Sequence, residues 1–152
     1  MPDKVFNTSF EISLRLLLLL REFGEPESLD RIFAGDFITT YGKDFGVSSY
    51  NLNGDNNYLF SEFVSRREIV KNALKDGALQ NYFRLVNGRQ GILYGISEEG
   101  KSLAEKLQSE YANEYKTIAR GTVMAIKNKD DHAVLLEINR ILSSTLEGAS
   151  AT

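Results

Sequence analysis

At 152 residues, with 42% hydrophobic and 26% charged residues, the chain has the composition of a single globular domain. It has no cysteine, which excludes disulfides and thiolate metal sites and fits a cytoplasmic location. The net charge of −3 argues against a protein dedicated to binding nucleic acid. The leucine run at 16–20 lies between Arg15 and Arg21 and has no small-residue cleavage site after it. It is far shorter than the ~20 apolar residues that span a membrane, so we expect a buried helix, neither leader nor anchor.

Three helices are predicted in the first half of the chain, at about residues 9–24, 29–41 and 59–76. Thr8 and Ser28 are the expected N-cap residues of the first two, because their hydroxyls can accept hydrogen bonds from the first free amides. Residues 43–57 are rich in Gly, Ser, Asn and Asp and are expected to form a loop.

A β-hairpin and two further helices are predicted in the second half. Residues 78–86 and 90–96 are rich in β-branched and aromatic residues and flank Asn87-Gly88, a pair typical of a type I′ turn. Ser97 can cap a long helix reaching about Ile126, and a last helix follows a polar break at 128–131.

This order predicts an α+β, mostly α fold, namely a winged helix-turn-helix with one hairpin wing and appended C-terminal helices. We expect one domain over 1–147. Its winged-helix core is about 6–109, its C-terminal helices about 98–147, and 148–152 is a frayed tail.

The sequence offers no chemistry typical of an enzyme. His132 is the only histidine, and no phosphate-binding glycine loop, Gly-x-Ser-x-Gly elbow or His-Glu-x-x-His helix is present. We therefore predict a non-enzymatic protein with no catalytic residue, no cofactor and no metal.

One segment imitates a calcium-binding loop. The spacing 1, 3, 5, 7 and 12 of such a loop is met by Asn51, Asn53, Asp55, Asn57 and Glu62. The first position is normally Asp and the sixth normally Gly, but here the sixth is Asn56. A single carboxylate at the front of the loop supplies too little charge for calcium. The preferred interpretation is an Asn-rich turn that caps the third helix.

Positive charge is concentrated in residues 57–96, which hold six basic and three acidic side chains, so this segment is +3 and the remainder −6. A 100° helical wheel places Ser65, Glu68, Asn72 and Lys75 on the solvent face of the third helix. A glutamate in that face repels phosphate and disfavours sequence-specific reading of DNA. The possible contacts are weak and sequence-independent, through Lys71, Lys75, Arg84 and Arg89.

Tyrosines are the candidate contacts with protein partners, because tyrosine is enriched at interface centres. The candidates are Tyr58, Tyr111 and Tyr115. The alternative is that these aromatic side chains belong to the core.

Two charges fall on buried faces. Asp36 lies seven residues after Leu29 on the second helix, and Arg67 lies within the apolar face of the third. An unpaired charge there costs several kcal/mol. We therefore predict a structural ion pair between Asp36 and Arg67, with Arg66 as the alternative partner of Asp36. In the competing interpretation Arg67 faces a partner subunit.

Three segments carry a resemblance to a known family: FNTSFEISLRLLLLL at 6–20, LDRIFAGDFITTYGKDFG at 29–46, and NLNGDNNYLFSEFVSRREIVKNA at 51–73. The motifs FNT-x-x-E-I and SEF-x-x-RRE are its most specific parts. Along nearly its whole length the chain resembles the middle component of bacterial ABC-three-component systems, the group that includes Lamassu-type defence operons.

The resemblance implies an antiviral defence role as an adaptor between an SMC-like coiled-coil ATPase and an effector, often a nuclease. It supplies no catalytic residue. The alternative function is a winged-helix transcriptional regulator, which would require a dimer and a basic reading face.

Overall fold

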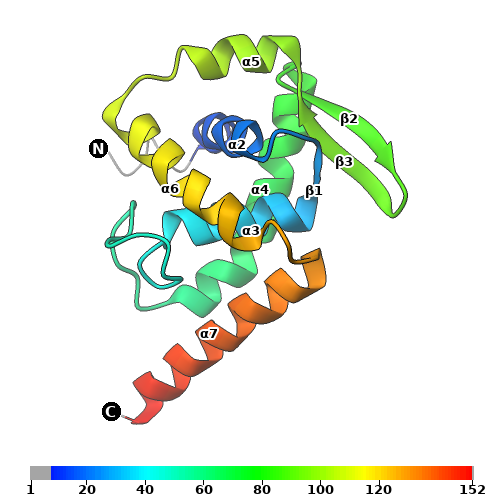
Figure 1. Cartoon of the computed structure of the whole chain (residues 1–152). Coiled ribbons are helices and arrows are strands. Elements are labelled where there is room, and N and C mark those ends of the chain that lie inside the picture. Colours follow the sequence, from blue (N-terminus) through cyan, green and yellow to red (C-terminus); the bar gives the residue numbers. More distant parts are fainter. Residues whose placement is uncertain (1–7, 152) are drawn as a thin grey trace.

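The computed structural model describes residues 8–151, with the side chains of residues 8–144. The elements in chain order are α2 (Ser9–Phe23), β1 (Glu27–Ser28), α3 (Leu29–Thr40), α4 (Leu59–Leu79), β2 (Phe83–Gly88), β3 (Gly91–Ile96), α5 (Glu98–Glu105), α6 (Glu110–Ile126) and α7 (Asp131–Ala151) (Figure 1). The fold is therefore an α-rich α+β fold, as expected. No helix in the described part of the chain is long and apolar enough to cross a membrane.

Helix α2 lies at the centre of a group formed with α3, α4, α5 and α6, all of which contact it (Figure 1). It begins where the Thr8 hydroxyl accepts a hydrogen bond from the Glu11 amide, and it ends at Gly24, which has a left-handed φ of 78°. Every position from 15 to 20 is buried. The prediction of a leucine-rich helix enclosed on nearly all sides is confirmed.

Helices α3 and α4 pack against α2 and against each other. The predicted cap of α3 is confirmed, since the Ser28 hydroxyl accepts a hydrogen bond from the Arg31 amide at 3.1 Å. Helix α4 begins where expected but continues through Gly77 to Leu79, beyond its predicted end at about residue 76. Gly77 is buried, and the ring of Phe83 packs directly on its Cα. The glycine therefore allows this ring to approach the helix backbone closely, and it does not end the helix.

The three strands form an antiparallel sheet in the order β1-β3-β2. The hairpin is confirmed, but its turn is not Asn87-Gly88. Phe83 pairs with Ile96 and Gly88 with Gly91, which leaves residues 89 and 90 in the turn. This register puts the buried Phe83 ring into the core, and a slip by one residue would turn it to solvent. Burial therefore outweighs the local preference of the Asn-Gly pair.

The predicted long helix is two helices. Residues 106–109 separate α5 from α6. The Ser109 hydroxyl accepts a hydrogen bond from the Ala112 amide at 3.1 Å and thereby caps α6. Because α5 and α6 both pack on α2, the break allows the chain to change direction while both helices keep contact with the core.

Helix α7 closes a second apolar cluster. Its buried residues Val134, Ile138 and Leu142 cover side chains of α3 and α6. Arg31 fixes the start of this helix, because its guanidinium donates to the Asp131 carboxylate at 3.0 Å and to the Ile126 carbonyl at 2.7 Å. The predicted tail at 148–152 lies outside the side chains that the structure describes.

The contact between Gly77 and Phe83 can be tested by adding one methyl group. A Cβ on Gly77 would lie 2.3 Å from a Phe83 ring carbon. We expect Gly77→Ala to lower the free energy of unfolding by about 1–3 kcal/mol, the usual cost of overpacking. Urea titration followed by circular dichroism measures it. Gly121→Ala is the control, because a Cβ there meets only the Val47 carbonyl at 3.8 Å. This helical substitution should stabilise the protein by about 0.5–1 kcal/mol, and an equal loss in both variants would contradict the assignment.

Candidate partner interface

Four helices meet at the carboxylate of Asp36, which has no exposed surface. Arg15 of α2 donates to both of its oxygens, from Nε at 2.8 Å and from Nη2 at 2.9 Å. Arg66 of α4 donates from Nη1 at 2.9 Å, and the Tyr115 hydroxyl of α6 donates at 2.8 Å. Asp36 therefore joins α3 to three other helices with charge-assisted hydrogen bonds.

The prediction of an ion pair for Asp36 is confirmed for the alternative partner, Arg66, and is wrong for Arg67. Arg67 is about half exposed and pairs with Asp30 at the start of α3, 2.8 Å away. Consecutive residues of a helix point about 100° apart, so only one of the two arginines can face the buried carboxylate. The part played by Arg15 was missed, although an arginine directly before the leucine run, on the buried side of the helix, was a visible signal.

Burial alone would raise the pKa of Asp36. The charges of Arg15 and Arg66 and the hydrogen bonds from Arg15 and Tyr115 outweigh it, so the net pKa of this carboxyl is lowered. The Tyr115 pKa is raised well above its usual value, because burial and the nearby Asp36 carboxylate both disfavour a phenolate. The network thus holds an ionised aspartate and a neutral tyrosine.

The three candidate interface tyrosines have different environments. Tyr115 is wholly buried in the core, so its expected place at an interface is wrong, and the core alternative holds for it. Tyr111 is half-buried and donates a hydrogen bond from its hydroxyl to Asn53 Oδ1 at 2.9 Å. Only Tyr58 projects freely, with 76% of its surface exposed.

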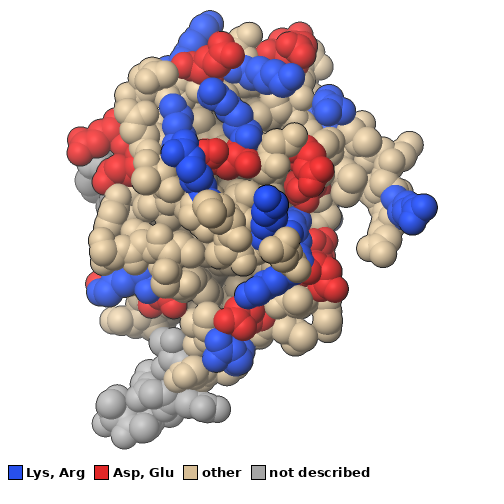
Figure 2. Space-filling view, viewed as in Figure 1, with Lys and Arg blue, Asp and Glu red and all other residues tan. Residues whose placement is uncertain are grey.

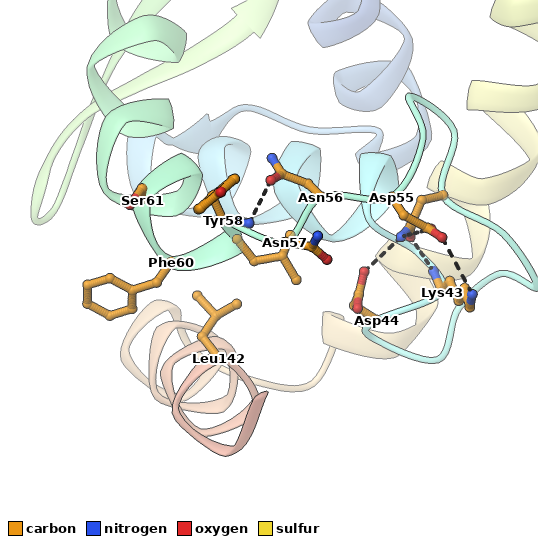
Figure 3. Close-up of a pocket in the computed structure, with 11 residues that line it drawn as sticks. Lys43, Asp44, Asp55, Asn56, Asn57, Tyr58, Phe60, Ser61 and Leu142 are labelled. Atoms are coloured by element: carbon orange, nitrogen blue, oxygen red, sulfur yellow. Dashed lines mark hydrogen bonds and ion pairs between the residues drawn. The ribbon is translucent and has the colours of Figure 1, made fainter. Parts of the chain in front are cut away.

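Tyr58 lies beside a cavity of about 480 Å³ between the 43–58 loop, the start of α4 and helix α7 (Figure 3). One wall is apolar and includes Phe60 and Leu142, which Figure 3 shows on the α4 and α7 side. The opposite wall is polar and includes Asp44 and Asp55. An apolar wall facing a few placed polar groups is the usual form of a recognition pocket.

The polar wall is organised by Asn51, whose side chain is buried. Its Nδ2 donates to Asp44 Oδ2 at 2.8 Å and to Asp55 Oδ1 at 3.0 Å, and its Oδ1 accepts from the Lys43 amide at 3.0 Å. The loop therefore closes on itself and does not cap α4, whose N-cap residue Tyr58 has no side-chain cap. Among the described residues no group of three or more acidic or histidine side chains could hold a metal ion.

The apolar wall continues onto the outer surface of α4. Phe60 is 46% exposed, and Val64 one turn later is 64% exposed. The other side of the helix agrees with its wheel, since Ser65, Glu68, Asn72 and Lys75 are all exposed. We refer to Tyr58, Phe60 and Val64 together as the α4 patch.

The candidate DNA contacts lie on two elements. Lys71 and Lys75 are exposed on α4, and Arg84 and Arg89 are exposed on the hairpin. Arg84 also donates to the Ile96 carbonyl at 3.2 Å. Figure 2 shows basic and acidic side chains interspersed over the face in view, without a continuous basic surface.

A family model with the description "ABC-three component (ABC-3C) system Middle Component 2" matches residues 5–147. The chain belongs to this family. The resemblance to ABC-three-component middle components is therefore confirmed, and this middle component is expected to act together with other proteins. No curated protein and no solved structure matches it.

The buried network predicts unequal effects for two aspartates of α3. We expect Asp36→Asn to destabilise this middle component by about 3–5 kcal/mol, because it leaves buried arginine charge uncompensated. Asp30→Asn removes only the exposed pair with Arg67 and should cost about 1 kcal/mol or less. Chemical denaturation of both variants measures the difference.

The same comparison has a pH signature. The folded-state pKa of Asp36 lies below the unfolded value of about 3.9. Its contribution is therefore present above that value and is lost as pH falls through the folded pKa. The stability difference between wild type and Asp36→Asn should shrink on acidification. A difference that stays constant from pH 7 to pH 2 would contradict the ionised network.

Proposed function

We propose that this middle component is a non-enzymatic adaptor of a bacterial antiviral defence complex, one that joins an SMC-like ABC ATPase to an effector nuclease. Its membership of a multi-component family supports a role among partners. The observation that carries the proposal is the α4 patch, in which the exposed Tyr58 and Phe60 line one cavity and the exposed Val64 lies one turn beyond Phe60. Contiguous apolar side chains left in water are typical of a surface that a partner covers.

The proposed fold type is a winged helix-turn-helix in which α3 and α4 form the helical pair and β2–β3 the wing. The element order and the hairpin that projects beyond the helices support it (Figure 1). In this arrangement α4 takes the place of a recognition helix. Its outer surface begins with Phe60 and Val64 and has Glu68 in the middle, a composition better suited to protein than to a phosphate backbone.

A minor role in holding DNA is the second candidate. Lys71 and Lys75 lie one turn apart on exposed positions of α4, and the described structure records no ion pair for either. Together with Arg84 and Arg89 they could neutralise a few phosphates without reading bases. Such contact would assist the complex and would not define its target.

The adaptor function can be tested by reconstitution with the SMC-like ABC ATPase of the proposed complex. We expect wild type to form a stable complex and Val64→Asp to weaken it by at least tenfold, about 1.4 kcal/mol, because a charge is placed in an apolar contact. Biolayer interferometry gives the two affinities.

Met124→Asp is the matched control, since Met124 is at least as exposed as Val64, at 73% against 64%, but lies on α6. It should bind as wild type does, and neither substitution should change the melting temperature. Equal binding by Val64→Asp and wild type would remove the α4 patch from the interface. No binding by wild type would refute the adaptor function itself.

For DNA, we expect micromolar or weaker binding by the isolated protein that is lost as salt rises. Replacing both Lys71 and Lys75 by Gln should lower the slope of log K against log[salt] by roughly 2. Fluorescence anisotropy with an arbitrary duplex measures this slope. Tight binding to one operator at physiological salt would instead favour a transcriptional regulator.

A further inference from the structure

Strand β2 is an open edge of the sheet. In the described part of the chain it pairs only with β3, while β3 has β2 on one side and the short β1 on the other. Figure 1 shows the hairpin reaching away from the helices, so none of them lies along its outer part. An unpaired strand presents a row of amide and carbonyl groups on which another strand can pair.

The register identifies which groups are free. Gly88 and Gly91 flank the two-residue turn and form the last pair of the ladder. In an antiparallel hairpin of this kind the flanking pair is hydrogen-bonded, and hydrogen-bonded pairs then alternate with non-bonded ones. Val86 therefore directs its amide to β3, whereas Leu85 and Asn87 direct theirs outward.

One face of the hairpin also carries apolar side chains that remain exposed. Leu85 lies opposite Tyr94, and Ile92 lies two residues before Tyr94 on the same face. Leu85 is 56% exposed and Ile92 is 51% exposed. This apolar stripe continues the face on which Phe83 enters the core, but nothing in the described structure covers its outer half.

Devices that protect natural sheet edges are missing from β2. The strand has no proline, and its paired register with β3 runs without a bulge. Its one charged residue, Arg84, donates to the Ile96 carbonyl of β3 and so lies over the ladder. Residues 83–96 contain two arginines and no acidic residue, so an acidic segment is the one with complementary charge.

We propose that the β2 edge is a second docking site, where an extended acidic segment of another component of the system adds a strand to the sheet. The segment would hydrogen-bond with the outward groups of Leu85 and Asn87 and cover the apolar stripe with its own alternate side chains. The inference rests on the proposed adaptor function. It adds a site on a different element from the α4 patch, as an adaptor between two partners requires.

Amide hydrogen exchange on the complex with the proposed ATPase and effector tests this without altering the protein. The Leu85 and Asn87 amides should exchange fast in the free chain and at least about tenfold more slowly in the complex. The Val86 amide is the internal control, because its bond to β3 should protect it in both states. Unchanged rates for Leu85 and Asn87 in a formed complex would overturn the proposal.

A variant supplies the second readout. Asn87→Pro removes an outward amide but no bond to β3, and proline is tolerated at such edge positions. It should weaken the complex roughly tenfold, whereas the matched Asn87→Ala, which keeps the amide, should bind as wild type. Both variants keep Arg84 and Arg89, so neither removes a basic side chain that could contact DNA. If Asn87→Pro released DNA but left the protein complex intact, the β2 edge would be serving DNA and not a protein strand, and the proposal would be overturned. If wild type itself binds neither the ATPase nor the effector, the adaptor function is refuted. If wild type binds them and Asn87→Pro binds equally well, only the docking site on β2 is refuted.

Discussion

The carboxylate of Asp36 is shared by helices α2, α3, α4 and α6, and the arrangement of the molecule depends on it. Its partners Arg15, Arg66 and Tyr115 come from three different helices. Apolar packing alone tolerates small rotations of a helix, but bidentate and charge-assisted hydrogen bonds do not. The network therefore determines the orientation of α4 relative to α2 and α3, and with it the direction in which the surface of α4 faces.

That orientation separates two faces of α4. Val70 and Leu74 face the core with Arg66, while Phe60 and Val64 are turned to solvent at the end nearest α7. The helix that would read DNA in a winged-helix regulator thus presents apolar side chains at one end and lysines at the other. A rigid scaffold with an apolar exposed patch suits an adaptor, because a preorganised surface loses little conformational entropy when a partner binds.

The hairpin and the α4 patch lie on different elements and offer different chemistry. The patch offers side chains around a cavity, whereas the β2 edge offers backbone groups that only an extended chain can satisfy. Two unlike surfaces allow two partners to bind without competing. The placement of both follows from the central helix α2, against which α4 packs directly and on which the base of the hairpin rests.

Local chemistry along the chain was enough to predict the caps at Thr8 and Ser28, the buried leucine run, the hairpin, and the need of Asp36 for an arginine. Local signals could not determine what depends on distant contacts. The hairpin turn does not lie at the Asn-Gly pair, because burial of Phe83 sets the register of the strands. Tyr115 lies in the core, because its hydroxyl donates a hydrogen bond to the buried Asp36 carboxylate. The angle at which the helices cross decides which arginine pairs with Asp36. It also decides that Phe60 stays exposed. Only the tertiary structure sets that angle, since it results from packing along whole helices.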